Sequence, residues 1–229
     1  TLDLGGAVQT LAGVQLAGGV VANGTLTSVS TFDLQGGTVD AVLAGTAGLT
    51  KSTDGTVALN AAASVTGTTT VRGGVLALGG PQRLAQDSTL VVEGGTLDLG
   101  GFGQTLQGVQ QSGGLIANGV LTSLSPFDMR GGTVQATLDG TAGLTKSGTG
   151  TLTLWSANSY TGTTTVVDGV LRLEGPQRLA PGGSLVVSGG VLDLGAGAQT
   201  MAGVQQTGGL ITNGTLTSQS VFDMQTGTV

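Results

Sequence analysis

The chain repeats itself every 95 residues, and the repeat contains no insertion or deletion. The segment Thr-Leu-Asp-Leu-Gly-Gly at 1–6 returns at 96–101 and, as Val-Leu-Asp-Leu-Gly-Ala, at 191–196. Repetition in one long register is typical of a solenoid, in which each structural unit contacts only its neighbours. We therefore expect one elongated domain, residues 1–229, with internal repeats at 1–95, 96–190 and 191–229.

A shorter repeat lies inside the long one. Four-residue segments with apolar second and fourth positions recur every 18 to 21 residues, as at Thr96–Leu99, Thr151–Leu154 and Val170–Leu173. Side chains on a strand alternate between its two faces, so the leucines should point inward and the third residue outward. Five such segments make one long repeat. The pattern predicts an all-β fold, a right-handed parallel β-helix of about twelve coils.

Stacking these segments in parallel predicts two columns of side chains. The inward column is Leu97, Ile116, Val134, Leu152, Leu171 and Leu192. The outward column is Asp98, Ala117, Gln135, Thr153, Arg172 and Asp193. Only Arg172 and Asp193 would place opposite charges on adjacent coils, and an exposed pair of that kind adds at most about 1 kcal/mol.

Glycine and asparagine mark the corners of the predicted coils. Gly-Gly doublets precede strand starts at 36–37, 94–95, 113–114, 131–132 and 189–190. Asn-Gly steps recur at Asn23, Asn118 and Asn213. Both residue types adopt positive φ more easily than other residues, so they are expected where the chain changes direction.

The composition excludes several classes of protein. A net charge of −6 with only 7 Lys and Arg residues leaves no basic stripe, so nucleic acid is not an expected partner. Cysteine and histidine are both absent, which rules out disulfides, thiolate or imidazole metal sites, and Ser-His-Asp catalysis. No apolar run approaches the ~20 residues that a membrane-spanning helix needs, so this segment should not insert into a membrane.

The segment from Gly148 to Leu173, GTGTLTLWSANSYTGTTTVVDGVLRL, resembles the passenger-associated repeat of bacterial autotransporters. Gly55 to Leu78 is a degenerate copy, with Ala63 and Val65 in place of Asn158 and Tyr160. The resemblance implies a fragment of a longer passenger at the surface of a Gram-negative bacterium or secreted from it. It also implies translocation by a C-terminal β-barrel outside this sequence.

The acidic residues are too dispersed for catalysis. Asp3, Asp98 and Asp193 recur at the 95-residue period, as do Asp33, Asp128 and Asp223. Five coils at about 4.8 Å each separate the members of either set by roughly 24 Å, too far to act on one sugar. We therefore expect no enzyme activity and no catalytic, cofactor-binding or metal-binding residues.

Two groups of residues are candidates for binding. Trp155 and Tyr160 could form a sugar platform, although aromatic residues at a coil corner more often cover the core. Arg83 and Arg178 lie in Gly-Pro-Gln-Arg-Leu-Ala segments that should bulge from the surface. They could contact a partner, but a solvated turn is the favoured interpretation.

Threonine clusters at 68–70 and 163–165 could suggest an ice-binding ladder. Because they occur once per long repeat, a flat array over many coils should not form.

Three functions remain open. The favoured one is a stalk that supports adhesion, self-aggregation or biofilm formation, with another copy or the host surface and matrix as partner. The second is a passive stalk that carries an enzyme or toxin domain, and the remote third is a polysaccharide-active enzyme. A cassette copied in register favours the first, because weak contacts repeated along two chains gain avidity.

Overall fold

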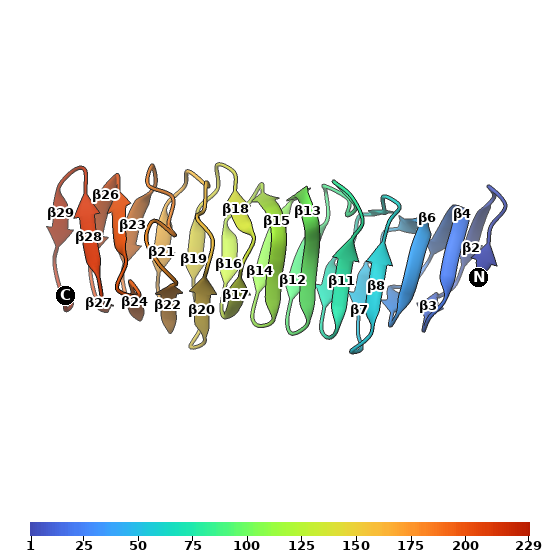
Figure 1. Cartoon of the computed structure of the whole chain (residues 1–229), viewed down its shortest axis with the longest axis horizontal. Helices are drawn as coiled ribbons and strands as arrows, with labels where there is room; N and C mark the ends of the chain where they lie inside the picture. The colour runs from blue at the N-terminus through green and yellow to red at the C-terminus, as the bar shows by residue number, and fades with distance from the viewer. The chain divides into compact units, whose positions relative to one another are not determined.

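A computed structural model describes all residues, 1–229, and shows an all-β chain without a helix (Figure 1). Parallel strands stack into a β-solenoid of about twelve turns, which confirms the predicted fold class. The chain divides into two compact units: residues 1–108 with 114–121, and residues 109–113 with 122–229. Each unit is a stack of coils in its own right.

In the first unit, one sheet follows the order β1-β4-β6-β8-β11-β13-β15, and a second follows β3-β5-β7-β10-β12. The strands β2 and β9 pair with β4 and β6. The strands are β1 (Leu2–Asp3), β2 (Val8–Leu11), β3 (Gln15–Leu16), β4 (Val20–Ser28), β5 (Phe32–Leu34), β6 (Gly37–Gly45), β7 (Leu49–Lys51), β8 (Thr56–Leu59), β9 (Ser64–Val65), β10 (Thr69–Val71), β11 (Val75–Leu78), β12 (Thr89–Val92), β13 (Thr96–Leu106) and β15 (Leu115–Ser123).

The second unit repeats this arrangement. One sheet follows the order β17-β20-β22-β24-β27, a second follows β14-β16-β19-β21-β23-β26-β29, and β25 pairs with β28. The strands are β14 (Gly108–Gln111), β16 (Phe127–Met129), β17 (Gly132–Val134), β18 (Thr137–Asp139), β19 (Leu144–Lys146), β20 (Thr151–Leu154), β21 (Thr164–Val166), β22 (Val170–Leu173), β23 (Ser184–Val187), β24 (Val191–Asp193), β25 (Ala198–Met201), β26 (Gly203–Gln206), β27 (Leu210–Thr212), β28 (Thr215–Ser218) and β29 (Phe222–Met224).

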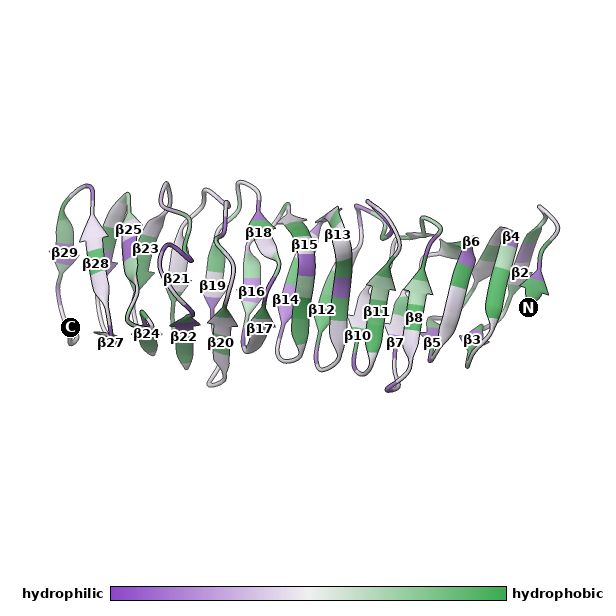
Figure 2. Ribbon diagram, viewed as in Figure 1, coloured by the Kyte–Doolittle hydropathy of each residue, from purple (hydrophilic) through white to green (hydrophobic).

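The core consists of the inward side chains of both sheets. Apolar and more polar residues alternate along many of the strands, as the bands of colour in Figure 2 show, and this alternation creates the core. In β20, for example, Leu152 and Leu154 are buried whereas Thr153 between them is not. The predicted inward column is confirmed where Leu152 pairs with Leu171 and Leu171 with Leu192. Two-residue alternation therefore sets which side chains are buried.

One step of the predicted column is wrong. Val134 pairs with Leu154, and Gly132 takes the place opposite Leu152. The turn at 147–150, which leads into β20, is two residues longer than the turn at 130–131, which leads into β17. A shift of two residues leaves every side chain on its predicted face, because the period of a strand is two.

Coil length also varies slightly more than predicted. The shortest step between paired residues is 17 residues, from Leu34 to Lys51. The longest is 21 residues, from Val71 to Val92, as predicted.

The outward column has the same two-residue shift, because Thr133 rather than Gln135 pairs with Thr153, and it differs from the prediction at two further places. Ala117 is buried, although its equivalent Ala22, which also precedes an asparagine bend, is not. Arg172 and Asp193 are neighbours in the register, as expected. Arg172, however, forms its ion pair with Glu174 of its own strand end, at 2.6 Å, while Asp193 accepts from the backbone N–H of Gly195 and the amide of Asn213.

The predicted corners are confirmed at the asparagines, whose φ angles are 56° at Asn23, 57° at Asn118 and 58° at Asn213. At Asn23 the chain bends within β4, and the pairing of β4 with β6 shifts register between Ala22 and Thr25. Asparagine tolerates this left-handed conformation better than most residues, so it can turn the chain without breaking the sheet.

Candidate functional site

One recurrent polar feature of the surface is a set of three aspartates, Asp33, Asp128 and Asp223, here called the aspartate row. They occupy the middle, outward position of β5, β16 and β29. In β5 and β16 the residues on either side of the aspartate are buried, so packing of the strand fixes the direction of the carboxylate.

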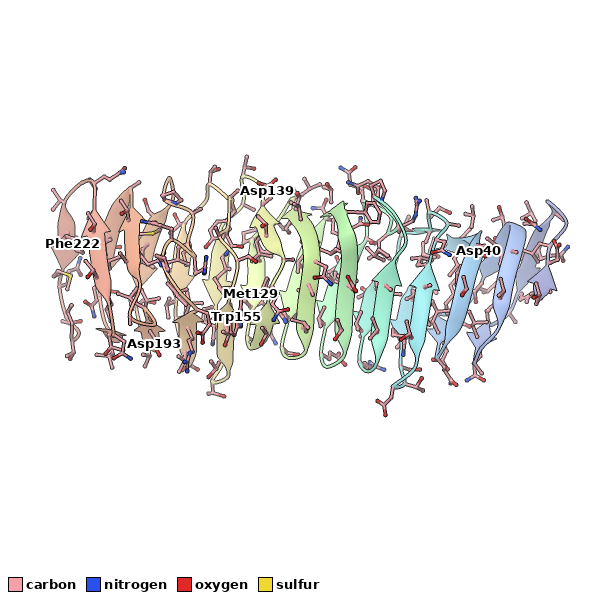
Figure 3. All side chains as sticks on the ribbon, in the orientation of Figure 1. Asp40, Met129, Asp139, Trp155, Asp193 and Phe222 are labelled. Atoms are coloured by element: carbon pink, nitrogen blue, oxygen red, sulfur yellow. The ribbon has the colours of Figure 1, made fainter.

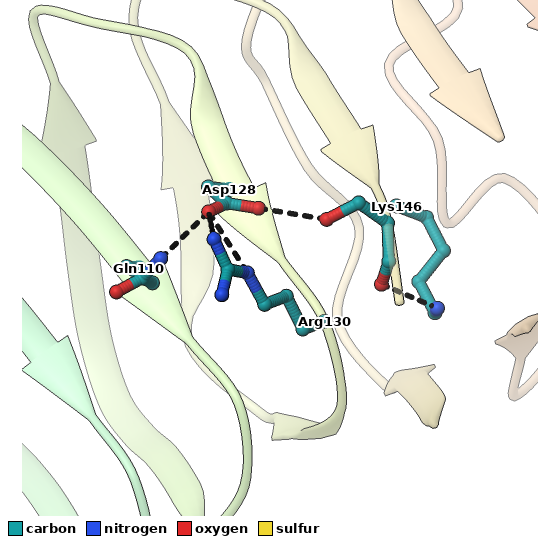
Figure 4. A network of polar contacts seen from close by, with 5 residues as sticks. Gln110, Asp128, Arg130 and Lys146 are labelled. Atoms are coloured by element: carbon teal, nitrogen blue, oxygen red, sulfur yellow. Dashed lines mark hydrogen bonds and ion pairs between the residues drawn. The ribbon is translucent and has the colours of Figure 1, made fainter. Parts of the chain in front are cut away.

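Each member of the row is held by donors from neighbouring coils. Asp128 accepts from the Gln110 amide at 2.7 Å, from Arg130 Nη2 at 2.9 Å and from the Ser147 hydroxyl at 2.9 Å (Figure 4). Gln110 precedes Asp128 by one coil in the register and Ser147 belongs to the next coil. One carboxylate therefore links three successive coils.

The arrangement recurs at Asp33, and Asp223 has two of the three donors. Asp33 accepts from Gln15 and Gln35, both at 2.8 Å, and from the Ser52 hydroxyl. Asp223 accepts from Gln205 at 2.8 Å and from Gln225 at 3.1 Å. The donor two residues after the aspartate therefore varies: it is Arg130 in the second repeat and a glutamine, Gln35 or Gln225, in the two others.

The hydrogen bonds stabilise the charged carboxylates. The hydroxyl of Ser52 and the amide of Gln15 hold the pKa of Asp33 below its ordinary value. Partial burial raises the pKa of Asp128, but donation from Gln110, Arg130 and Ser147 outweighs it, so that pKa is also lowered. A carboxylate that accepts several hydrogen bonds is an ionised surface group rather than an acid catalyst.

The second set of recurrent aspartates shapes the bends. Asp3 accepts from the Gly5 backbone N–H at 2.8 Å and from Asn23 at 3.0 Å, and both bonds lower its pKa. Asp98 makes the same two bonds to Gly100 and Asn118. These carboxylates therefore hold the left-handed asparagine of the following coil in place. The chain contains no group of three His, Cys, Asp or Glu residues placed to hold a metal ion.

The two aromatic candidates have different environments. Tyr160 is fully buried, its hydroxyl lies 2.6 Å from that of Thr164, and its ring lies 6.3 Å from that of Phe127. Trp155 is 48% exposed (Figure 3). The structural interpretation is confirmed for Tyr160, and of the two residues only Trp155 is accessible to a ligand.

The Gly-Pro-Gln-Arg-Leu-Ala segments do not simply bulge, contrary to the prediction. Leu84 and Leu179 are buried, and each backbone N–H donates to a buried glutamine of the next coil, Gln104 or Gln199. Gln104 also donates to the carbonyl of Leu84 at 3.0 Å. The glutamine satisfies the polar backbone of the loop, which allows the loop to pack against the stack.

The two arginines of these segments are half-buried and bond to local carbonyls. Arg83 donates to Pro81 at 3.2 Å, and Arg178 donates to Glu174 at 2.8 Å. A Cβ on Gly80 would lie 2.3 Å from the Arg83 guanidinium, so this side chain lies directly on the turn backbone. Both arginines therefore brace their turns.

The threonine clusters divide between the faces of the coil. Thr69 and Thr164 are buried, whereas Thr70 and Thr165 face outward. On the outward face Thr70 pairs with Thr50 of the preceding coil and with Val91 of the following coil, so the threonine ladder is only two residues long there.

Sequence reasoning missed several buried polar residues, among them Lys51, Lys146, Gln104, Gln199 and Asn158. The signal for the lysines was available, because alternation in Leu-Thr-Lys at 49–51 and 144–146 places the lysine on the same face as the leucine. Alternation in Gln-Thr-Leu at 104–106 likewise places Gln104 on the same face as the buried Leu106, whereas its equivalent in the first coil, Gln9, is exposed.

The fold and the recurrent surface define a β-solenoid repeat protein. Residues 49–78 and 144–173 each match the family described as passenger-associated-transport-repeat, which confirms the resemblance noted in the sequence. The chain thus carries two repeats characteristic of an autotransporter passenger domain. No curated protein and no solved structure matches the chain. No helix of this chain is long and apolar enough to cross a membrane.

Proposed function

We propose that this chain is part of a Gram-negative autotransporter passenger, displayed at the cell surface or secreted, that supports adhesion, self-aggregation or biofilm formation. The two passenger-associated-transport repeats and the solenoid fit the stalk of such a protein. Translocation by a separate C-terminal β-barrel belongs to the same proposal.

The observation that carries the adhesive part is the recurrence of the aspartate row with its donors. Asp33, Asp128 and Asp223 present the same carboxylate and amide pattern in each repeat. A partner that bonds weakly to one copy can bond to the next without further loss of translational freedom, so binding increases with repeat number. We favour another copy of this chain as that partner, because the same pattern is then present on both sides.

The charge balance makes the proposal sensitive to salt. The chain has 13 carboxylate side chains and 7 basic side chains, and the two lysines among the latter are buried. Like charge therefore opposes association of two copies, and added salt should promote it by screening. A basic host surface would give the opposite dependence.

One observation favours the second candidate, a passive stalk. The donors of the aspartate row belong to the chain itself, so the carboxylates of Asp33 and Asp128 already have partners. A stalk that only separates another domain from the cell would show the same structure and no self-association.

An in-register deletion tests the proposal. Removing residues 96–190 joins Gly95 to Val191 and keeps the order of coils, because the deleted segment is one whole period. Cells that display the full chain should aggregate more than cells that display the deletion variant at equal surface amount, and 0.5 M salt should enhance the difference.

The control is Arg178→Ala, which should aggregate like the unaltered chain. If the deletion variant aggregates as well as the full chain, the avidity argument is wrong. If neither exceeds cells without the chain, the passive stalk is supported instead. We also expect no hydrolase or lyase activity on polysaccharides, because the aspartates are dispersed.

A further inference from the structure

Two lysines are fully buried in a chain that otherwise keeps its charges at the surface. Lys51 and Lys146 end β7 and β19, and both side chains are 0% exposed. The three ion pairs of the structure involve only arginines. A buried ammonium group without a carboxylate is costly unless other groups replace its hydration.

Backbone carbonyls supply that replacement. Lys146 Nζ donates to the carbonyls of Ser147 at 2.9 Å, Gly148 at 2.7 Å and Asp168 at 2.8 Å, and Figure 4 shows the first of these bonds. Lys51 Nζ donates to the carbonyls of Thr53 and of Gly73, the latter at 3.1 Å.

Three acceptors fit the ammonium form of Lys146. An ammonium group has three donors and no lone pair, whereas the lone pair of a neutral amine would face one of the oxygens. Burial lowers the pKa of the Lys146 side chain, and the charge of Asp168 opposes that effect.

The carbonyl acceptors around each lysine, here called its cage, coincide with the two longest turns that lead from the second sheet of a unit to the first. The turns at 52–55 and 147–150 have four residues, and they follow Lys51 and Lys146 directly. The turns that join the same pair of sheets in the other coils have two or three residues, as at 130–131 and 167–169. The extra residues supply carbonyls that fold inward around the ammonium group.

Each cage also contacts the turn of the next coil. Gly73 and Asp168, which supply one carbonyl each, are one coil further along the stack. A Cβ on Gly169 would lie 2.7 Å from Lys146 Nζ and 2.4 Å from the Gly150 carbonyl oxygen. The next turn therefore approaches so closely that only glycine fits there.

We propose that Lys51 and Lys146 are internal ammonium clamps, each of which organises a four-residue turn and fastens it to the turn of the following coil. The cage is a cation site that the chain fills with its own side chain. Each clamp thereby holds the two-residue shift in register that the long turn introduces.

Both clamps lie within the matched repeats, since residues 49–78 and 144–173 begin two residues before each lysine. Lys146 does not contribute a hydrogen bond to Asp128, whose donors are Gln110, Arg130 and Ser147. The clamp proposal therefore does not depend on the function proposed for the aspartate row.

The test is hydrogen exchange of the full chain with Lys146→Ala, which empties the cage. We expect amides of residues 147–150 and 167–170 to exchange at least tenfold faster than in the unaltered protein, while the turn at 52–55 is unchanged. Propylammonium chloride replaces the deleted atoms, so it should restore protection to within threefold, whereas sodium chloride of equal ionic strength should not.

The matched control is Val166→Ala, because Val166 pairs with Lys146 and is equally buried but has no carbonyl cage. In this variant the two salts should act alike. Lys146→Met keeps an unbranched side chain as far as Cε but removes the ammonium donors, and it should lose protection in the same turns. Protection equal to that of the unaltered protein in Lys146→Met, or an equal effect of propylammonium on Val166→Ala, would overturn the proposal.

Discussion

Truncation of Leu171 to alanine should destabilise the second unit by about 3 to 4 kcal/mol. Leu171 is fully buried in β22 and pairs with Leu152 on one side and Leu192 on the other, both of them also buried. Loss of three methylene equivalents at about 0.8 kcal/mol each removes roughly 2.4 kcal/mol of transfer free energy. The rigid stack leaves a cavity, which brings the total into the range of about 2 to 5 kcal/mol found for such changes.

Trp155 fluorescence during urea denaturation is the assay, because the only tryptophan directly follows β20, which pairs with β22. In a solenoid the loss is local to neighbouring coils. The equivalent substitution Leu76→Ala, in the first unit, should therefore shift the Trp155 transition less than Leu171→Ala does. In a thermal scan, the Leu171→Ala shift corresponds to about 6 to 16 °C.

The control is Thr153→Ala, which alters an outward side chain in the adjacent strand and should cost under about 1 kcal/mol. Equal losses from Leu171→Ala and Thr153→Ala would refute the assignment of inward and outward faces. Equal effects of Leu76→Ala and Leu171→Ala on the fluorescence transition would refute the local nature of the coupling.

Three further changes test other parts of the structure. Burial raises the pKa of Tyr160 to about 12 from 10.0, so the folded chain holds a proton that the unfolded chain loses. Stability should thus fall as pH rises from about 10 to 12, and absorbance at 295 nm should show no tyrosinate at pH 10.5 until the chain unfolds. Asn118→Ala should lower the free energy of unfolding, measured by urea denaturation, by about 1 to 2 kcal/mol, because φ is 57° there. Asn118→Gly should lower it by less, since glycine adopts positive φ without steric cost, and equal losses would contradict this. Gln104→Ala leaves the backbone of Leu84 without its partner and should cost about 1 to 3 kcal/mol, whereas its exposed equivalent Gln9→Ala should cost little.

The arrangement of strands follows from the sequence because it depends on local pattern. The apolar alternation in segments such as Thr151–Leu154 decides which side chains are buried, and the 95-residue period requires equivalent coils to repeat. Asn118 and its equivalents mark bends for a reason that is also local, the conformational preference of one residue. The passenger repeat was recognisable on the same basis.

Other features depend on contacts between coils, which no local pattern specifies. The pairing of Val134 with Leu154 depends on the length of the turn at 147–150 relative to its neighbour. Two of the donors to Asp128, Gln110 and Ser147, are 18 and 19 positions away in the chain, so only stacking brings them to the carboxylate.

The buried lysines combine both kinds of information. Alternation in Leu-Thr-Lys is enough to place Lys146 on the inward face. It does not show that an ammonium group can remain there, because Asp168, which supplies one carbonyl of its cage, is 22 residues further along the chain. The sequence by itself thus determined the direction of each side chain, through the period of the strand, and only the tertiary structure decided which groups meet, because neighbouring coils supply the partners.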